Sequence, residues 1–187
     1  MNLIPSSILS IAPGRGRLGV ATFRDGRLIY YGVKSLRQFR SNADLLTGLE
    51  KILSNLCTYY CIRTVIMPLL NKQQRHSAAL ICVEKVIEQF ARRQNIAIHR
   101  YDPMAIRRVF CPGIRPTKAN TSDKLVEIYP ELIRYRSGES DWELRYYGYL
   151  FSAIAGGKVF KMVHHDSGTK GTKKCSARQQ SERTVCN

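Results

Sequence analysis

The chain has 187 residues, of which 44% are hydrophobic, and this is enough for one ordinary domain with a packed core. No apolar run is long enough to span a membrane, and the first residues lack the basic and apolar regions of a signal peptide, so we expect neither a membrane span nor secretion. The net charge is +16, and the segment from Lys158 onward carries only +5 of it, which leaves +11 on the rest of the chain. Nucleic acid is the partner that a charge of this sign and spread favours. Surplus surface charge without a partner is the alternative interpretation.

Six cysteines occur without any Cys-x-x-Cys pair: Cys57, Cys61, Cys82, Cys111, Cys175 and Cys186. Their spacing does not match a zinc finger, and we interpret them as reduced thiols. The expected location is therefore the cytoplasm or the nucleoid.

The first third of the chain predicts three short strands. Residues 7–12 form an apolar run that Pro13-Gly14 interrupts, and residues 18–23 and 28–34 form two further runs. The dipeptide Asp25-Gly26 lies between the second and third runs, and it favours a tight hairpin turn. We therefore expect these three strands to be antiparallel.

Helices and strands then alternate. Apolar residues at helical spacing predict helices over 45–56, 77–93, 103–110, 118–129 and 141–155. Ser41 or Asn42 can cap the first of them, Thr117 can cap the fourth, and Gly156-Gly157 closes the last. A short run of β-branched residues predicts a strand over 63–67, and an alternation of apolar and polar residues predicts another over 96–101. Residues 134–140 are polar and predict a loop. We expect one domain over residues 1–161 and a basic, disordered tail over 162–187. The order of elements indicates an α/β protein with helices on both faces of its sheet.

Three short motifs occur in a fixed order along the chain. The first strand ends in Ala12-Pro13-Gly14, the fourth ends in Thr64-Val65-Ile66-Met67-Pro68, and Thr117-Lys118 precedes a later helix. This ordered set resembles the RuvC-type Holliday junction resolvases of the ribonuclease-H-like superfamily. The resemblance covers residues 7 to about 160. It implies a ribonuclease-H-like (RuvC-like) mixed five-stranded sheet whose first three strands are antiparallel.

The resemblance also implies four acidic residues that hold two divalent metal ions, and this sequence lacks all four. The matching positions carry Ala12, Met67, Tyr149 and Ser152. Such metal ions activate water and stabilise the leaving oxygen of a phosphodiester, and magnesium requires oxygen ligands. We therefore predict degenerate catalytic positions, no bound metal and no cofactor. Magnesium would be needed only if other carboxylates had taken over, for which the candidates are Asp25, Asp102, Asp123, Glu127, Asp141 and Glu143.

Basic residues remain in the loops and short helix that the resemblance places around the former catalytic cleft. They are Arg15, Arg17, Lys72, Arg75, Arg107, Arg108, Arg115 and Lys118. Lysine and arginine at such positions would hold phosphates without reading the base sequence.

Three functions are consistent with these observations. The first is a catalytically degenerate RuvC-like protein, a pseudoenzyme that binds branched or structured nucleic acid, DNA rather than RNA, as a subunit of a nucleic-acid complex in DNA recombination. The second is an active, magnesium-dependent, structure-specific endonuclease with relocated carboxylates. The third is a structural or interaction subunit that no longer binds nucleic acid. The resemblance also implies a homodimer.

Overall fold

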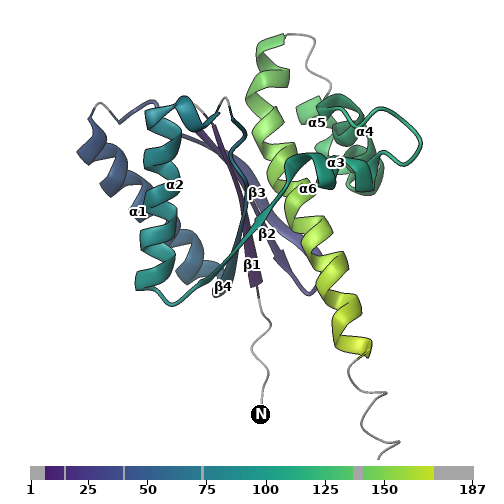
Figure 1. Cartoon of the computed structure of the whole chain (residues 1–187), viewed down its shortest axis with the longest axis horizontal. Coiled ribbons are helices and arrows are strands. Elements are labelled where there is room, and N and C mark those ends of the chain that lie inside the picture. The colour runs from purple at the N-terminus through teal and green to yellow at the C-terminus, as the bar shows by residue number, and fades with distance from the viewer. Residues whose placement is uncertain (1–6, 15, 40, 73, 137–140, 171–187) are drawn as a thin grey trace, which may run out of the picture.

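A five-stranded sheet lies between two layers of helices in the computed structural model of the chain (Figure 1). The structure describes residues 7–14, 16–39, 41–72, 74–136 and 141–170, and for residues 42, 141–145 and 165–170 it describes the backbone alone. The strands are β1 (Ser7–Gly14), β2 (Arg17–Arg24), β3 (Arg27–Ser35), β4 (Ile62–Pro68) and β5 (Ala97–Tyr101). The helices are α1 (Asn42–Tyr60), α2 (Ala78–Arg93), α3 (Pro103–Phe110), α4 (Lys118–Ile128), α5 (Ile133–Arg136) and α6 (Asp141–Lys170), with 3-10 turns at Gln74–His76 and Pro130–Leu132.

The strand order is β3-β2-β1-β4-β5, which confirms the predicted mixed sheet. β1, β2 and β3 are antiparallel neighbours, whereas β4 runs parallel to both β1 and β5. Asp25 and Gly26 join β2 to β3 with φ angles of 49° and 80°, the positive values that a type I′ hairpin turn requires. Among the described residues, no helix has the length and apolar character needed to cross a membrane.

The sheet separates two hydrophobic cores, because the side chains of each strand alternate between its two faces. Leu9, Ile11 and Val65 point toward α1 and α2, which cover one face of the sheet. Ile8 and Ile66 point to the opposite face, which α6 covers, and α3 and α4 pack in turn against α6 (Figure 1). Successive side chains of a strand point to opposite faces, so this register decides which residues reach the α6 side.

Helix α6 is longer than predicted. The expected end at Gly156-Gly157 is wrong, because α6 continues to Lys170. These glycines allow close packing: a Cβ on Gly156 would lie 2.5 Å from the ring of Tyr101, and one on Gly157 would lie 2.3 Å from the ring of Phe23. The boundary expected between residues 161 and 162 therefore falls inside a helix, and the predicted tail beyond residue 170 lies outside the described residues.

Two other boundaries also differ from the prediction. β1 does not stop before Pro13, which pairs with Leu18 of β2. The observed pairing of β1 with β4 ends at Ser10 and Ile66, so Pro13 has a strand neighbour on one side only, where its missing N–H is tolerated. The start of the predicted loop 134–140 belongs to α5, while residues 137–140 lie outside the described part of the chain.

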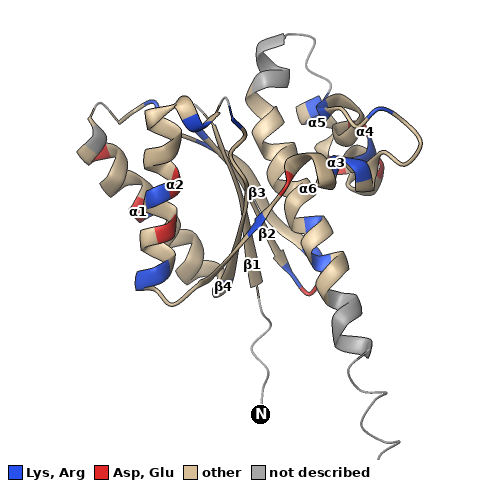
Figure 2. Cartoon of the chain, in the orientation of Figure 1, with Lys and Arg blue, Asp and Glu red and all other residues tan. Residues whose placement is uncertain are grey.

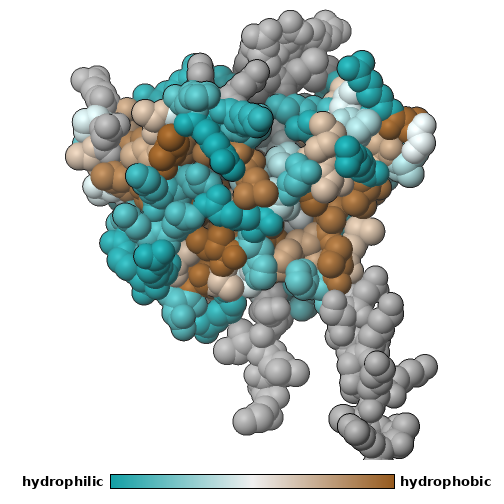
Figure 3. Space-filling model, viewed as in Figure 1, coloured by the Kyte–Doolittle hydropathy of each residue, from teal (hydrophilic) through white to brown (hydrophobic). Residues whose placement is uncertain are grey.

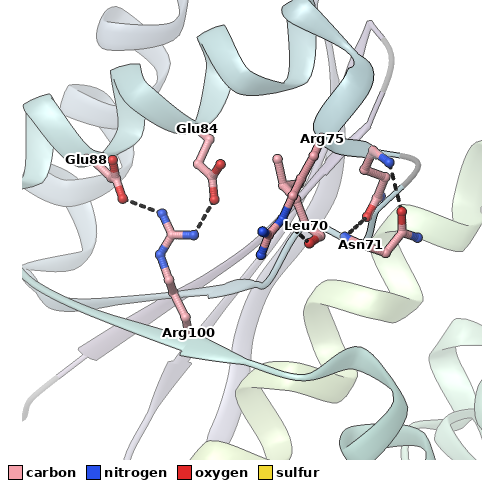
Figure 4. Close-up of polar contacts among 7 residues, drawn as sticks. Leu70, Asn71, Arg75, Glu84, Glu88 and Arg100 are labelled. Carbon is pink, nitrogen blue, oxygen red and sulfur yellow. Dashed lines mark hydrogen bonds and ion pairs between the residues drawn. The ribbon is translucent and has the colours of Figure 1, made fainter.

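Arg100 connects the edge strand β5 to α2 (Figure 4). Its guanidinium donates to the carboxylates of Glu84 and Glu88, two residues one helical turn apart. We expect Arg100→Gln to lower the free energy of unfolding by about 1 kcal/mol, because these ion pairs are partly exposed and charge-assisted. Urea unfolding measures the difference in free energy of unfolding between the variant and the wild type. Added salt should make this difference smaller, because salt screens partly exposed ion pairs. Lys85→Gln, an exposed change on the same helix, is the control, and an equal loss in both variants would contradict a role for the Arg100 bridge.

Candidate nucleic-acid interface

A pocket of about 250 Å³ opens where β1, β4 and β5 end. Ala12 and Pro13 of β1, Pro68 of β4 and Tyr101 of β5 form part of its wall. The other walls come from α3, α4, α6 and the loop after β4. Because these parallel strands share one direction, their carboxyl ends meet at the same edge of the sheet, as in other α/β sites.

The structure brings together three of the four positions that lack acids, Ala12, Tyr149 and Ser152, all of which line the pocket. Met67 does not join them and is fully buried on the opposite face, in the core beneath α1 and α2. The assignment of Met67 to the cleft is therefore wrong by one residue, since alternation turns Ile66 and Pro68 to the α6 side instead. Pro68, the residue that does line the pocket, is not acidic either.

Tyr149 fills the space beside the end of β1. A Cβ on Gly14 would lie 2.2 Å from Cζ of Tyr149, so the phenol ring lies directly over this glycine. Ser152 directs its hydroxyl into its own helix, where Oγ donates to the carbonyl of Gly148 at 2.7 Å. The Tyr101 hydroxyl donates to the carbonyl of Ser152 at 3.1 Å, and burial raises the pKa of Tyr101. Tyr149 and Ser152 thus serve packing and local hydrogen bonding in this structure.

Among the residues that the structure describes, the pocket wall holds one carboxylate, that of Asp102. Its Oδ1 accepts from the N–H of Met104 at 2.9 Å, as the cap of α3. In the part of the chain that the structure describes, no group of three His, Cys, Asp or Glu side chains is placed to hold a metal ion. This donor set does not fit a two-magnesium site.

The other candidate acids have different roles or lie outside the description. Asp25 forms the β2–β3 turn, Asp123 pairs with Arg136 at 2.7 Å, and Glu127 pairs with Lys124 at 2.8 Å. The side chains of Asp141 and Glu143 lie outside the described residues.

Two cations, Arg107 of α3 and Lys118 at the start of α4, line the pocket. Burial and the nearby Arg107 guanidinium lower the pKa of Lys118, which indicates that the two positive groups repel each other. None of the ion pairs among the described side chains involves Arg107 or Lys118. An anion bound between them would relieve this repulsion.

The other predicted basic residues that the structure describes do not line the pocket. Arg17 places its guanidinium 4.4 Å from the centre of the Tyr146 ring, and Arg75 donates through Nε to the carbonyl of Leu70 at 3.2 Å. Lys72, Arg108 and Arg115 are exposed, and Arg15 lies outside the described residues. Figure 2 shows Lys and Arg segments on α3 and around α4 and α5, all on the α6 side of the sheet.

The loop after β4 contributes two polar residues that the sequence reasoning missed. Asn71 and Gln74 line the pocket and bond to each other, since each backbone N–H donates to the other's side-chain oxygen, at 3.0 and 2.8 Å (Figure 4). A polar residue three positions from an asparagine is the available sequence signal, because Asn side chains cap such turns. The reciprocal bonds hold this loop in place at the pocket mouth.

The strand order, the covering helices and the pocket at the strand ends define the ribonuclease-H-like class of α/β proteins. No protein-family model matches the sequence, and no curated protein sequence matches it. Among solved structures, Thermus thermophilus RuvC is similar over 87% of this chain and 97% of its own, with a TM-score of 0.62 and 12% identity. The yeast mitochondrial Holliday junction resolvase is similar over 90% of this chain and 85% of its own, with a TM-score of 0.60 and 11% identity. The protein therefore has the fold of the RuvC-type resolvases.

A further similar structure is T. thermophilus RuvC in complex with a Holliday junction substrate. It covers 82% of this chain and 96% of its own, with a TM-score of 0.58 and 11% identity.

Proposed function

We propose that this protein is a RuvC-like protein that binds branched or structured DNA without cleaving it, as a subunit of a nucleic-acid complex. The observation that carries the proposal is the pocket at the carboxyl ends of the strands. Arg107 and Lys118, two cations that form no ion pair with any described side chain, line it together with Asp102, which already caps a helix and is the one carboxylate among the described lining residues. A phosphate would supply the missing negative charge.

The similarity in fold supports a branched substrate. One of the similar structures is described as a complex of RuvC with a Holliday junction substrate, and it matches most of this chain. The positive charge outside the C-terminal segment supports the same class of partner, because a duplex presents dense negative charge to any basic surface.

Fluorescence anisotropy with labelled four-way junction and linear duplex, over a series of salt concentrations, tests the proposal. We expect binding that weakens steeply with salt and is tighter for the junction, because phosphate contacts release counterions. Incubation of the bound junction with magnesium or manganese should leave it uncut. The absence of salt-sensitive binding to DNA would overturn the proposal and favour a subunit that acts through protein contacts alone.

Asp102 favours one alternative, an active endonuclease with relocated carboxylates. It is a carboxylate in the wall of the pocket that the proposal assigns to a phosphate. Junction cleavage by the purified protein that Asp102→Asn abolishes would establish this alternative and remove the non-catalytic function. Cleavage that Asp102→Asn leaves unchanged would instead point to acids outside the described side chains.

A further inference from the structure

The loop between α3 and α4 begins with a fixed turn. Pro112 and Gly113 occupy its two central positions, Gly113 has a φ of 76°, and the N–H of Ile114 donates to the carbonyl of Cys111 at 3.4 Å. Proline followed by a residue with positive φ is the pattern of a type II turn. This backbone turn fixes the chain at Ile114.

The second half of the loop is fixed as well. The carbonyl of Arg115 accepts from the N–H of Thr117 at 2.9 Å and from Nδ2 of Asn120 at 2.8 Å. Thr117 also caps α4, where its Oγ1 accepts from the N–H of Asn120 at 3.1 Å. The loop is therefore preorganised, and little conformational entropy would be lost if it bound a partner.

This rigid loop displays an apolar side chain among cations. Ile114 is 50% exposed and Val109 is 49% exposed, while Arg108 and Arg115 lie next to them in sequence and are also exposed. No Asp or Glu occurs between Asp102 and Asp123. In Figures 1 and 3 the loop projects from the side of the molecule, and hydrophobic atoms are visible in that region.

A single exposed isoleucine is ordinary, but its combination with flanking arginines and a stiff backbone favours a partner that is both anionic and apolar. Nucleic acid carries its anionic groups on the outside and its apolar base faces within, and these faces become accessible where stacking is interrupted. Proteins that open such steps insert Ile, Leu, Met or Phe between bases while basic residues hold the neighbouring phosphates. The positive charge spread over the rest of the chain favours nucleic acid over an acidic protein surface, and docking to a protein is an outcome of the test below.

We propose that Ile114 acts as an apolar wedge against unstacked bases at the branch point of a DNA junction, while Arg108 and Arg115 contact the flanking phosphates. This inference rests on the proposed function and deepens it, because it assigns the preference for branched over linear DNA to one loop. The two ends of this loop lie at the pocket, because Arg107 and Lys118 both line it. Ile114 and the pocket proposed to hold a phosphate therefore belong to the same part of the protein.

The test uses the full chain, a four-way junction with 2-aminopurine at the branch point, and a linear duplex of the same sequence. Wild-type protein should raise the fluorescence of the probe on binding, because an unstacked 2-aminopurine is less quenched. Ile114→Ser should remove this rise and weaken junction binding about tenfold, as expected from the loss of one partly buried apolar side chain, while duplex binding stays the same. Ile133→Ser is the matched control, since Ile133 is 54% exposed on α5.

Each outcome decides the inference. If Ile114→Ser keeps the junction affinity and the fluorescence rise, the wedge is overturned while the DNA-binding function stands. If Ile133→Ser produces the same loss, or if Ile114→Ser weakens duplex binding equally, Ile114 has no specific role at the branch. If Ile114→Ser leaves DNA binding intact and breaks a protein complex, the loop is a protein-docking surface. Failure of wild-type protein to bind either DNA overturns both the inference and the proposed function.

Discussion

Replacing Gly19 by alanine is expected to lower the free energy of unfolding by about 3 kcal/mol, the upper part of the range for overpacked cores. A Cβ on Gly19 would lie 2.1 Å from the carbonyl oxygen of Tyr149 and 2.3 Å from its carbonyl carbon. Both atoms belong to the backbone of α6, so no flexible side chain can move aside. The helix itself must shift away from the sheet, and urea or thermal unfolding of the purified variant measures the cost.

Gly148→Ala is the control for this change. Gly148 lies on the same helix, and a Cβ there would meet nothing within 4 Å. Alanine is a better helix former than glycine, so we expect Gly148→Ala to stabilise the protein by about 0.5 kcal/mol. If Gly19→Ala were as stable as Gly148→Ala, the close approach of α6 to β2 would be wrong.

The double substitution Arg107→Gln/Lys118→Gln should weaken DNA binding by about a hundredfold at moderate salt, since each charge-assisted contact to a phosphate contributes about 1.5 kcal/mol. The slope of the logarithm of affinity against the logarithm of salt concentration should also fall by about 1.8, because two phosphate contacts are lost. Both side chains line the pocket, so stability should change little. Anisotropy titrations with junction and duplex measure both quantities.

Lys51→Gln/Lys85→Gln is the matched control, because it removes the same charge from exposed positions on α1 and α2, across the sheet from the pocket. If binding depended only on the total charge of the protein, the two double variants would lose affinity equally. That result would contradict the assignment of the phosphate site to Arg107 and Lys118.

The lowered pKa of Lys118 gives the same site a pH dependence. Burial and Arg107 disfavour the charged form, so Lys118 loses its proton at a lower pH than an ordinary lysine does. Affinity for DNA should therefore fall as the pH rises through this lowered pKa. Lys118→Arg should remove that fall, because arginine stays charged throughout.

Most of the fold could be predicted from the sequence because its signals are local. The Asp25-Gly26 hairpin, the cap at Ser41 and the cap at Thr117 appear in the structure where the sequence places them. Gly156-Gly157 misled the prediction because the same dipeptide serves as a helix stop or as a close-packing site. The deciding partners, Tyr101 and Phe23, are distant in sequence.

The candidate site was predicted less completely. Five residues that the sequence assigns to the cleft do line the pocket in the structure: Ala12, Arg107, Lys118, Tyr149 and Ser152. The assignment of Met67 to the pocket failed because matching short motifs fixes a position in the strand only to within one residue. Neighbouring residues of a strand point to opposite faces of the sheet, so an error of one residue puts the side chain on the wrong face. The pairing of Asn71 with Gln74 depends on backbone geometry that a loop sequence does not fix.

The packing of Tyr149 over Gly14 has a consequence for any attempt to engineer a metal centre here. Exchanging Tyr149 for an acid would leave a void where the ring lies, and an acid at Ala12, which is 2% exposed, would have to fit into a close-packed wall. Neither substitution alone would supply the ligands of a metal site. Carboxylates would therefore have to be introduced together, with compensating changes in the surrounding packing.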